Sequence, residues 1–205
     1  MSRREREEED VEVVAICGSP RPKGNTATLI EALLEGAREA GAKTTRFDPA
    51  RMRIQDCNAG DECLVSAEAP CKLDDDMVEI YAALRRADAW VFGTPVYHAN
   101  VTGTLKRVID RMYAFYTNEG GEWRLGLEGR RCGAVIVVQA DAEQETPRRV
   151  AEYLEQVLGA YNVDVVGRIA ESSLAAPSDA AGRPELLARA KELGREIASE
   201  ADTLS

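Results

Sequence analysis

An apolar run that ends in a glycine-bearing polar loop, followed at once by an amphipathic segment, most constrains what this chain can fold into. Residues 11–17 (Val-Glu-Val-Val-Ala-Ile-Cys) are rich in β-branched side chains and predict a buried strand. Residues 26–40 carry apolar side chains at helical spacing. The junction at residues 18–26 therefore directs backbone N–H groups and the positive end of a helix dipole at one point, which predicts a phosphate-binding loop.

The same succession of strand, loop and helix recurs five times. The expected strands cover 11–17, 42–48, 88–92, 132–138 and 163–169, and the expected helices cover 26–40, 74–86, 103–115, 146–160 and 184–198. Parallel strands need crossover connections, so this order predicts an α/β sandwich with a five-stranded parallel sheet, formed by one domain over residues 11–205. Residues 1–10 are expected to be a solvated tail. Residues 49–72 show no sustained period, and 117–131 are expected to form a polar loop or flap.

Charge and composition limit the kinds of partner that this chain can bind. The 205 residues include 36 acidic and 26 basic side chains, a formal charge of -10, which argues against nucleic acid or an anionic membrane as a partner. No apolar run reaches the length of a membrane span, and the N-terminus lacks the apolar core of a secretory signal, so a cytoplasmic location is expected. The odd count of five cysteines argues against a disulfide framework.

In an open parallel sheet, ligands bind beyond the carboxyl ends of the strands. This rule directs attention to three loops, residues 18–26, 93–102 and 139–145. The first loop, Gly-Ser-Pro-Arg-Pro-Lys-Gly-Asn-Thr, lacks both the P-loop motif and the dinucleotide fingerprint. It resembles instead the Gly-Ser-Pro-Arg-x-x-Gly-Asn-Thr loop of the NADPH-dependent FMN reductase family and its iron–sulfur flavoprotein relatives. Residues 93–111 resemble the same family's G-(S/T)-P-V-Y-x-x-x-V-(S/T)-G-x-L-K-x-x-x-D-R signature.

This resemblance implies a flavodoxin-like fold with strand order 2-1-3-4-5 and a bound FMN. It places the FMN phosphate at Ser19, Arg21, Gly24, Asn25 and Thr26, and the flavin ring against Thr94, Pro95, Val96, Tyr97, His98 and Asn100. His98 is the only histidine. We interpret it as a contact beside the flavin rather than a catalytic group, because hydride transfer between nicotinamide and flavin needs no protein acid. No catalytic side chain is therefore predicted.

Two regions depart from the family pattern. Cys57, Cys63 and Cys71 align with the four-cysteine motif that holds a [4Fe–4S] cluster in the iron–sulfur flavoproteins, but Gly60 stands in place of the second cysteine. For want of a fourth ligand, neither a cluster nor a zinc site is expected, and the cysteines are interpreted as a vestige of the motif. The third loop, residues 139–145, is acidic where relatives often carry glycines, which leaves the choice between NADH and NADPH open.

The resemblance implies an FMN-dependent NAD(P)H oxidoreductase that reduces a small acceptor such as a quinone, a nitroaromatic compound, free flavin or a ferric chelate. The alternative is an electron carrier of the iron–sulfur flavoprotein type, whose acidic surface would dock to a basic protein partner. A homodimer or tetramer is expected. Lys106, Asp110 and Arg111 form either a dimer contact of the helix at 103–115 or a solvated face.

Overall fold

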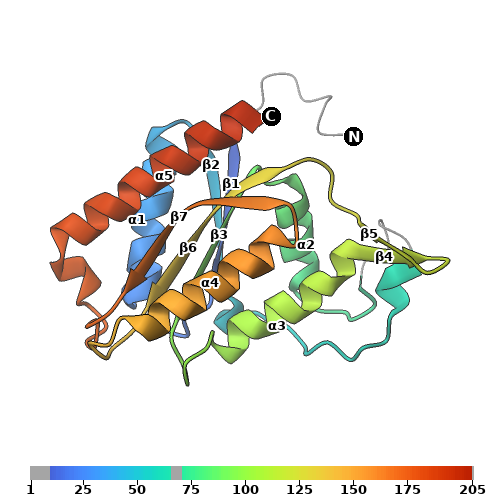
Figure 1. Cartoon of the computed structure of the whole chain (residues 1–205), viewed down its shortest axis with the longest axis horizontal. Helices are drawn as coiled ribbons and strands as arrows, with labels where there is room; N and C mark the ends of the chain where they lie inside the picture. The colour runs from blue at the N-terminus through green and yellow to red at the C-terminus, as the bar shows by residue number, and fades with distance from the viewer. Residues whose placement is uncertain (1–9, 66–70, 205) are drawn as a thin grey trace.

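A five-stranded parallel sheet forms the centre of the protein. The computed structural model describes residues 10–65 and 71–204. The sheet runs in the order β2-β1-β3-β6-β7 (Figure 1). Its strands are β1 (Glu12–Cys17), β2 (Lys43–Phe47), β3 (Ala89–Pro95), β6 (Arg131–Val138) and β7 (Val163–Glu171). Because β6 and β7 are the fourth and fifth strands of this sheet, the predicted order 2-1-3-4-5 is confirmed.

Helices cover both faces of the sheet. The helices α1 (Asn25–Glu39) and α5 (Pro184–Leu204) pack on one face, and α2 (Met77–Arg86), α3 (Gly103–Arg111) and α4 (Glu145–Gly159) lie on the other (Figure 1). Along β1, Val13 and Ala15 face the first layer, whereas Val14 and Ile16 face the second, and all four are buried. A strand covered on both faces leaves no polar position in its interior, which is why β1 is apolar from Val13 to Cys17.

The helices α1 and α5 cross at very short range. A Cβ built on Gly36 would lie 1.9 Å from the carbonyl oxygen of Lys191, and one built on Gly194 would lie 1.9 Å from that of Leu33. Only glycine permits such an approach of two backbones. Among the described helices, none is long and apolar enough to cross a membrane.

The structure corrects two sequence predictions of local structure. The helix expected over 103–115 ends at Arg111 and continues as a short 3₁₀ turn, Met112–Phe115. The polar loop expected at 117–131 instead contains a β-hairpin of β4 (Tyr116–Glu119) and β5 (Glu122–Leu125). Gly120 and Gly121 form its two-residue turn at φ values of 64° and 90°, a conformation that suits glycine. Further 3₁₀ turns cover Pro49–Arg51 (η2), Glu62–Val65 (η3) and Ala180–Gly182 (η5).

Candidate functional site: a phosphate loop joined to a ring loop

Three loops meet at the carboxyl edge of the sheet, after β1, β3 and β6. The N–H of Gly18 donates to the carbonyl of Gly93 at 2.7 Å, which joins the ends of β1 and β3. The N–H of Val96 donates to the carbonyl of Val138 at 2.8 Å, which joins the ends of β3 and β6. The predicted site residues of the first two loops therefore lie on neighbouring segments, as the sheet order requires.

The first loop turns directly into the N-terminus of α1. The Arg21 N–H donates to the Ser19 hydroxyl at 3.2 Å, and the Gly24 N–H donates to the Arg21 carbonyl at 3.0 Å. Gly24 precedes the first residue of α1 in an extended conformation. The first-turn N–H groups of any helix have no partner within the helix, so they are free to bind an anion here.

Thr26 supplies the sharpest test of whether a phosphate fits. Its side chain is only 1% exposed, and its hydroxyl finds no hydrogen-bond partner among the described residues. An unpaired buried hydroxyl costs free energy, and a bound phosphate oxygen would remove that cost. Space is also tight around the loop, since a Cβ on Gly24 would lie 3.0 Å from that of Arg21. The residues present fit the terminal phosphate of FMN.

The side chain of Asn25 is used differently from the sequence prediction. Its amide nitrogen donates to the carbonyls of Leu174 at 3.0 Å and Ala176 at 2.8 Å, and its oxygen accepts from the Ala180 N–H at 2.9 Å. These bonds tie the start of α1 to the segment between β7 and α5. The Asn25 amide is thus engaged within the protein, and its main-chain N–H is the group that remains for an anion.

The second loop contains a tight turn at Tyr97-His98-Ala99-Asn100. Tyr97 and Asn100 exchange backbone hydrogen bonds of 2.9 Å and 3.0 Å, and His98 and Ala99 adopt φ values of 47° and 57°. Non-glycine residues in this region are strained, which is a common property of ligand-binding loops. The turn leaves Tyr97 48% exposed and His98 exposed.

Threonine hydroxyls hold this second loop in place. The buried hydroxyl of Thr94 donates to the Pro95 carbonyl at 2.9 Å and accepts from the Thr102 N–H at 3.1 Å. Thr94 thus offers a ligand its main chain rather than its hydroxyl. In the same way, the side-chain oxygen of Asn100 accepts from the Val101 N–H at 2.8 Å.

Two further threonines join the two loops, and the sequence analysis did not select them. The hydroxyls of Thr102 and Thr104 both donate to the Gly18 carbonyl, at 2.7 Å and 2.9 Å. Thr102 also caps α3 by accepting from the Leu105 N–H at 3.2 Å. The family signature marks the first of these positions as Ser or Thr, which was the available signal. Their bonds fix the spacing between the phosphate loop and the ring loop.

In the third loop, an internal carboxylate occupies the helix N-terminus. Glu143 accepts hydrogen bonds from the N–H groups of Thr146 and Glu145 at the start of α4. The bonds from Thr146 lower the pKa of Glu143 below its ordinary value. Gln139 and Ser172 donate to the Glu143 carbonyl at 2.8 Å and 2.6 Å, which holds the loop. Since Glu143 already fills it, the N-terminus of α4 is not an anion site.

The three cysteines between residues 57 and 71 differ in exposure. Cys57 is exposed, whereas Cys63 and Cys71 are partly buried against the core, and all three are free thiols. Burial and the neighbouring Cys71 raise the pKa of Cys63. Within residues 10–65 and 71–204, no three His, Cys, Asp or Glu side chains are grouped to hold a metal ion. With Gly60 at the second position of the four-cysteine motif, the donor set lacks its fourth thiolate, so the residues present do not complete the usual ligation of a [4Fe–4S] cluster.

Arg111, expected on a solvated face or a dimer contact, is instead buried. Its guanidinium forms a bidentate ion pair with Asp75, at 2.7 Å and 3.2 Å, and donates to the Gln55 carbonyl at 3.0 Å. Burial alone would raise the pKa of Asp75, but the bonds from Arg111 and from two backbone N–H groups hold it below its ordinary value. Only Lys106 and Asp110 of the predicted trio lie on the surface, where they pair with each other.

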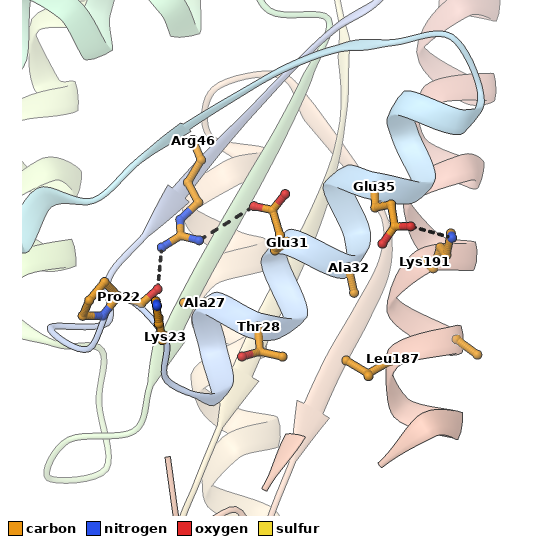
Figure 2. A pocket seen from close by; sticks show the side chains of 11 residues that line it. Pro22, Lys23, Ala27, Thr28, Glu31, Ala32, Glu35, Arg46, Leu187 and Lys191 are labelled. Carbon is orange, nitrogen blue, oxygen red and sulfur yellow. Dashed lines mark hydrogen bonds and ion pairs between the residues drawn. The ribbon is translucent and has the colours of Figure 1, made fainter. Parts of the chain in front are cut away.

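A hollow of about 560 Å³ lies between α1, β2 and α5 (Figure 2). Pro22 and Lys23 of the phosphate loop line one end of it. Arg46 donates to the Pro22 carbonyl at 3.2 Å and pairs with Glu31, and Lys191 pairs with Glu35 at 2.9 Å (Figure 2). These charges neutralise one another, and no residue of the second loop lines the hollow.

A doubly wound sheet of this order, with a single-phosphate cradle after β1 and a ring loop after β3, defines a flavodoxin-like flavoprotein. The chain belongs to the NADPH-dependent FMN reductase family, whose model matches residues 11–175. FMN is accordingly the cofactor. The predicted family, fold and cofactor are confirmed.

Individual relatives agree with this assignment. An iron–sulfur flavoprotein of Archaeoglobus fulgidus is 31% identical over 157 residues, which cover 77% of this chain and 66% of that protein. Another from Methanocaldococcus jannaschii is 40% identical over 104 residues, 51% of this chain and 52% of that protein. These matches thus span less than two thirds of either relative's length. In structure, an NAD(P)H:quinone oxidoreductase from Methanothermobacter marburgensis superposes with a TM-score of 0.69 at 24% identity, covering 92% of this chain and 100% of that one.

Proposed function

We propose that this protein is an FMN-dependent NAD(P)H oxidoreductase that passes hydride from the nicotinamide to bound FMN and the electrons on to a small acceptor. A quinone, a nitroaromatic compound, free flavin or a ferric chelate would suit an open site of this kind. The observation that carries the proposal is the pair of joined loops, with an unpaired Thr26 hydroxyl at one end and an exposed Tyr97 at the other. Bound FMN supplies a carrier that accepts hydride and returns electrons.

The chain's own residues bind and orient this cofactor. The first-turn N–H groups of α1, including that of Asn25, and the hydroxyls of Ser19 and Thr26 would hold the phosphate, and the exposed Arg21 would add a positive charge. Gly24 lets the backbone approach closely. At the other end, Pro95, Val96 and Tyr97 would line the ring, together with main-chain groups of Thr94, His98 and Asn100. His98 lies on the exposed turn and serves as a contact, with no proton-transfer role.

The runner-up is an electron carrier that exchanges electrons with a protein partner. Two observations favour it: the relatives named above are called iron–sulfur flavoproteins, and the formal charge of -10 suits a basic partner. The missing fourth cysteine opposes it, because Gly60 stands where the cluster motif has a thiolate ligand. A small-molecule acceptor is the simpler partner for a flavin without a cluster beside it.

Anaerobic rapid mixing separates these two functions. The FMN-loaded protein is mixed with NADH or with NADPH, and flavin absorbance is followed. We expect fast bleaching with at least one nucleotide and reoxidation by a quinone. As a matched control, the variant C57S/C63S/C71S should bleach at the same rate and contain as little iron as the unaltered protein. Absence of bleaching with both nucleotides, or iron that is lost in the triple variant, would favour the carrier.

A further inference from the structure

Arg46 lies near the end of β2, outside both signature loops, and its guanidinium contacts three segments. Nε and Nη2 both donate to the Asp48 carboxylate, at 3.1 Å and 2.8 Å, which fixes the partly buried side chain. Nη2 also donates to the Pro22 carbonyl of the phosphate loop at 3.2 Å, and Nη1 lies 3.9 Å from the Glu31 carboxylate of α1 (Figure 2). Arg46 thereby joins β2, the phosphate loop and α1.

The Pro22 carbonyl belongs to the central peptide of a tight turn. The Gly24 N–H donates to the Arg21 carbonyl at 3.0 Å, so Pro22 and Lys23 are the two middle residues of this turn. Type I and type II turns differ in the orientation of the peptide that joins these middle residues, and proline is accepted before it in both types. Proline fixes its own φ but leaves this peptide plane free to rotate. The bond from Arg46 is the contact that holds the plane.

The orientation of this peptide decides where the Lys23 N–H points. In a planar trans peptide, the C=O and the following N–H point in opposite directions, and no peptide bond in the described ranges is cis. Since Arg46 holds the Pro22 carbonyl on the side of β2, the Lys23 N–H points away from β2. β1 lies between β2 and β3 in the sheet, so this direction leads to the side of the ring loop, which follows β3.

The Lys23 N–H is also a free donor. Within the part of the chain that the structure describes, it donates to no group. The hydroxyl of Thr26, only 1% exposed, is a second polar group of the same loop that lacks a partner among the described residues. Neighbouring free donors in a loop that leads into a helix N-terminus are suited to binding a phosphate group.

We infer that Arg46 is a positioning residue for the phosphate loop, and that the Lys23 N–H which it orients is a further donor to the FMN phosphate. Neither residue is among those that the sequence motifs selected. Arg46 does not itself bind the cofactor, because it acts through the Pro22 carbonyl. The inference rests on the position of the phosphate proposed above, and it adds a contribution from β2 that neither motif contains.

Removal of the guanidinium tests the inference by comparing two flavins. FMN and riboflavin, the same flavin without its phosphate, are titrated into the FMN-free full chain and followed by flavin fluorescence, with far-UV circular dichroism as the check on folding. In Arg46→Met, the dissociation constant of FMN should rise roughly tenfold, whereas that of riboflavin should stay within about twofold. Arg46→Lys keeps a donor for the Pro22 carbonyl and should bind FMN within about threefold of the unaltered protein.

Arg38→Met is the matched control. Arg38 donates to the Glu31 carboxylate at 2.7 Å and to the Thr44 hydroxyl of β2 at 2.9 Å, but it does not contact the phosphate loop. This variant loses the same charge from the same region, so a purely electrostatic or structural effect would appear in it as well. Both flavin affinities should remain unchanged in Arg38→Met.

The amide resonance of Lys23 gives a second readout that needs no variant. In the unaltered protein, FMN should move the Lys23 amide proton downfield and riboflavin should not, and Arg46→Met should lose this response. Unchanged FMN affinity in Arg46→Met, equal losses for FMN and riboflavin, or a Lys23 amide that does not respond to FMN would each overturn the inference. An unaltered protein that binds both flavins equally tightly would refute the phosphate position itself, and this inference with it.

Discussion

The buried ion pair between Asp75 and Arg111 allows a quantitative prediction about the segment that carries the cysteines. The two side chains are 0% and 1% exposed. The Asp75 carboxylate accepts two hydrogen bonds from Arg111 and one each from the backbone N–H groups of Gln55, at 2.8 Å, and Met77, at 3.1 Å. One carboxylate thereby joins α2, α3 and the start of the cysteine segment.

Removing one partner leaves the other charge buried. In Asp75→Ala, the guanidinium keeps only its bond to the Gln55 carbonyl, and two backbone N–H groups lose their acceptor. We expect a loss of about 3–5 kcal/mol in the free energy of unfolding, the usual cost of an uncompensated buried charge. Arg111→Met should cost a similar amount, since the carboxylate then lacks its cation. The double variant D75A/R111M should lose about 2 kcal/mol less than the sum of the two.

Denaturant unfolding of the FMN-free protein is the suitable assay, because bound cofactor would add its own stabilisation. The pH dependence gives a second readout. The pKa of Asp75 is lowered in the folded state, so its contribution is complete above its ordinary pKa of about 3.9 and is lost as pH falls through the lower folded value. The stability difference between the unaltered protein and Asp75→Asn should therefore narrow below about pH 4.

Two results would refute this reasoning. Single variants that lose less than about 1 kcal/mol would mean that solvent reaches the pair. Additive losses in the double variant would mean that the two side chains stabilise the fold separately rather than through each other.

Three further predictions concern the site and the core. Thr26→Val removes the unpaired hydroxyl, so the FMN dissociation constant in a fluorescence titration should rise roughly tenfold. The stability of the FMN-free protein should stay the same or increase. An unchanged FMN affinity would mean that the phosphate binds elsewhere. Asparagine tolerates the positive φ of residue 98, so His98→Asn should keep the turn. The rate of flavin reduction by NAD(P)H should stay within about threefold of that of the unaltered protein. A hundredfold loss of rate would make His98 a catalytic group. Gly36→Ala should cost about 1–3 kcal/mol or more by overpacking against Lys191, while Gly159→Ala, with open space around it, should cost nothing measurable in thermal unfolding.

Hydrophobic periodicity was sufficient to predict the sheet and its covering helices. Strands such as β6 are apolar over almost all of their length, here from Cys132 to Val138, because both faces are covered, and this pattern has few alternative interpretations. The hairpin was missed because residues 117–131 are polar and β5 is exposed, so no buried face marks it. The adjacent Gly120 and Gly121 were the available signal, since a two-residue glycine turn between short segments favours a hairpin.

The sequence located the two loops, and the structure adds which of their side chains bond within the protein. The motifs located both loops, whereas the hydroxyl of Thr94 and the amide of Asn25 turned out to bond within the protein. Sequence reasoning assigns polar residues in a ligand loop to the ligand, because the competing internal acceptors lie far away along the chain. Arg111 shows the same difficulty, since its burial depends on Asp75, which lies in the turn before α2.

The bonds of Asn25 have a consequence for how the protein is made. Its three partners lie 149, 151 and 155 residues further along the chain, and α1 packs at backbone contact against α5. During synthesis, both signature loops leave the ribosome long before these partners exist. Contacts of such sequence separation form late because the intervening chain must be ordered first. The loop that begins at Gly18 is therefore held in its final form only after residues 174–180 have been made, and we expect a nascent chain without them to bind FMN weakly.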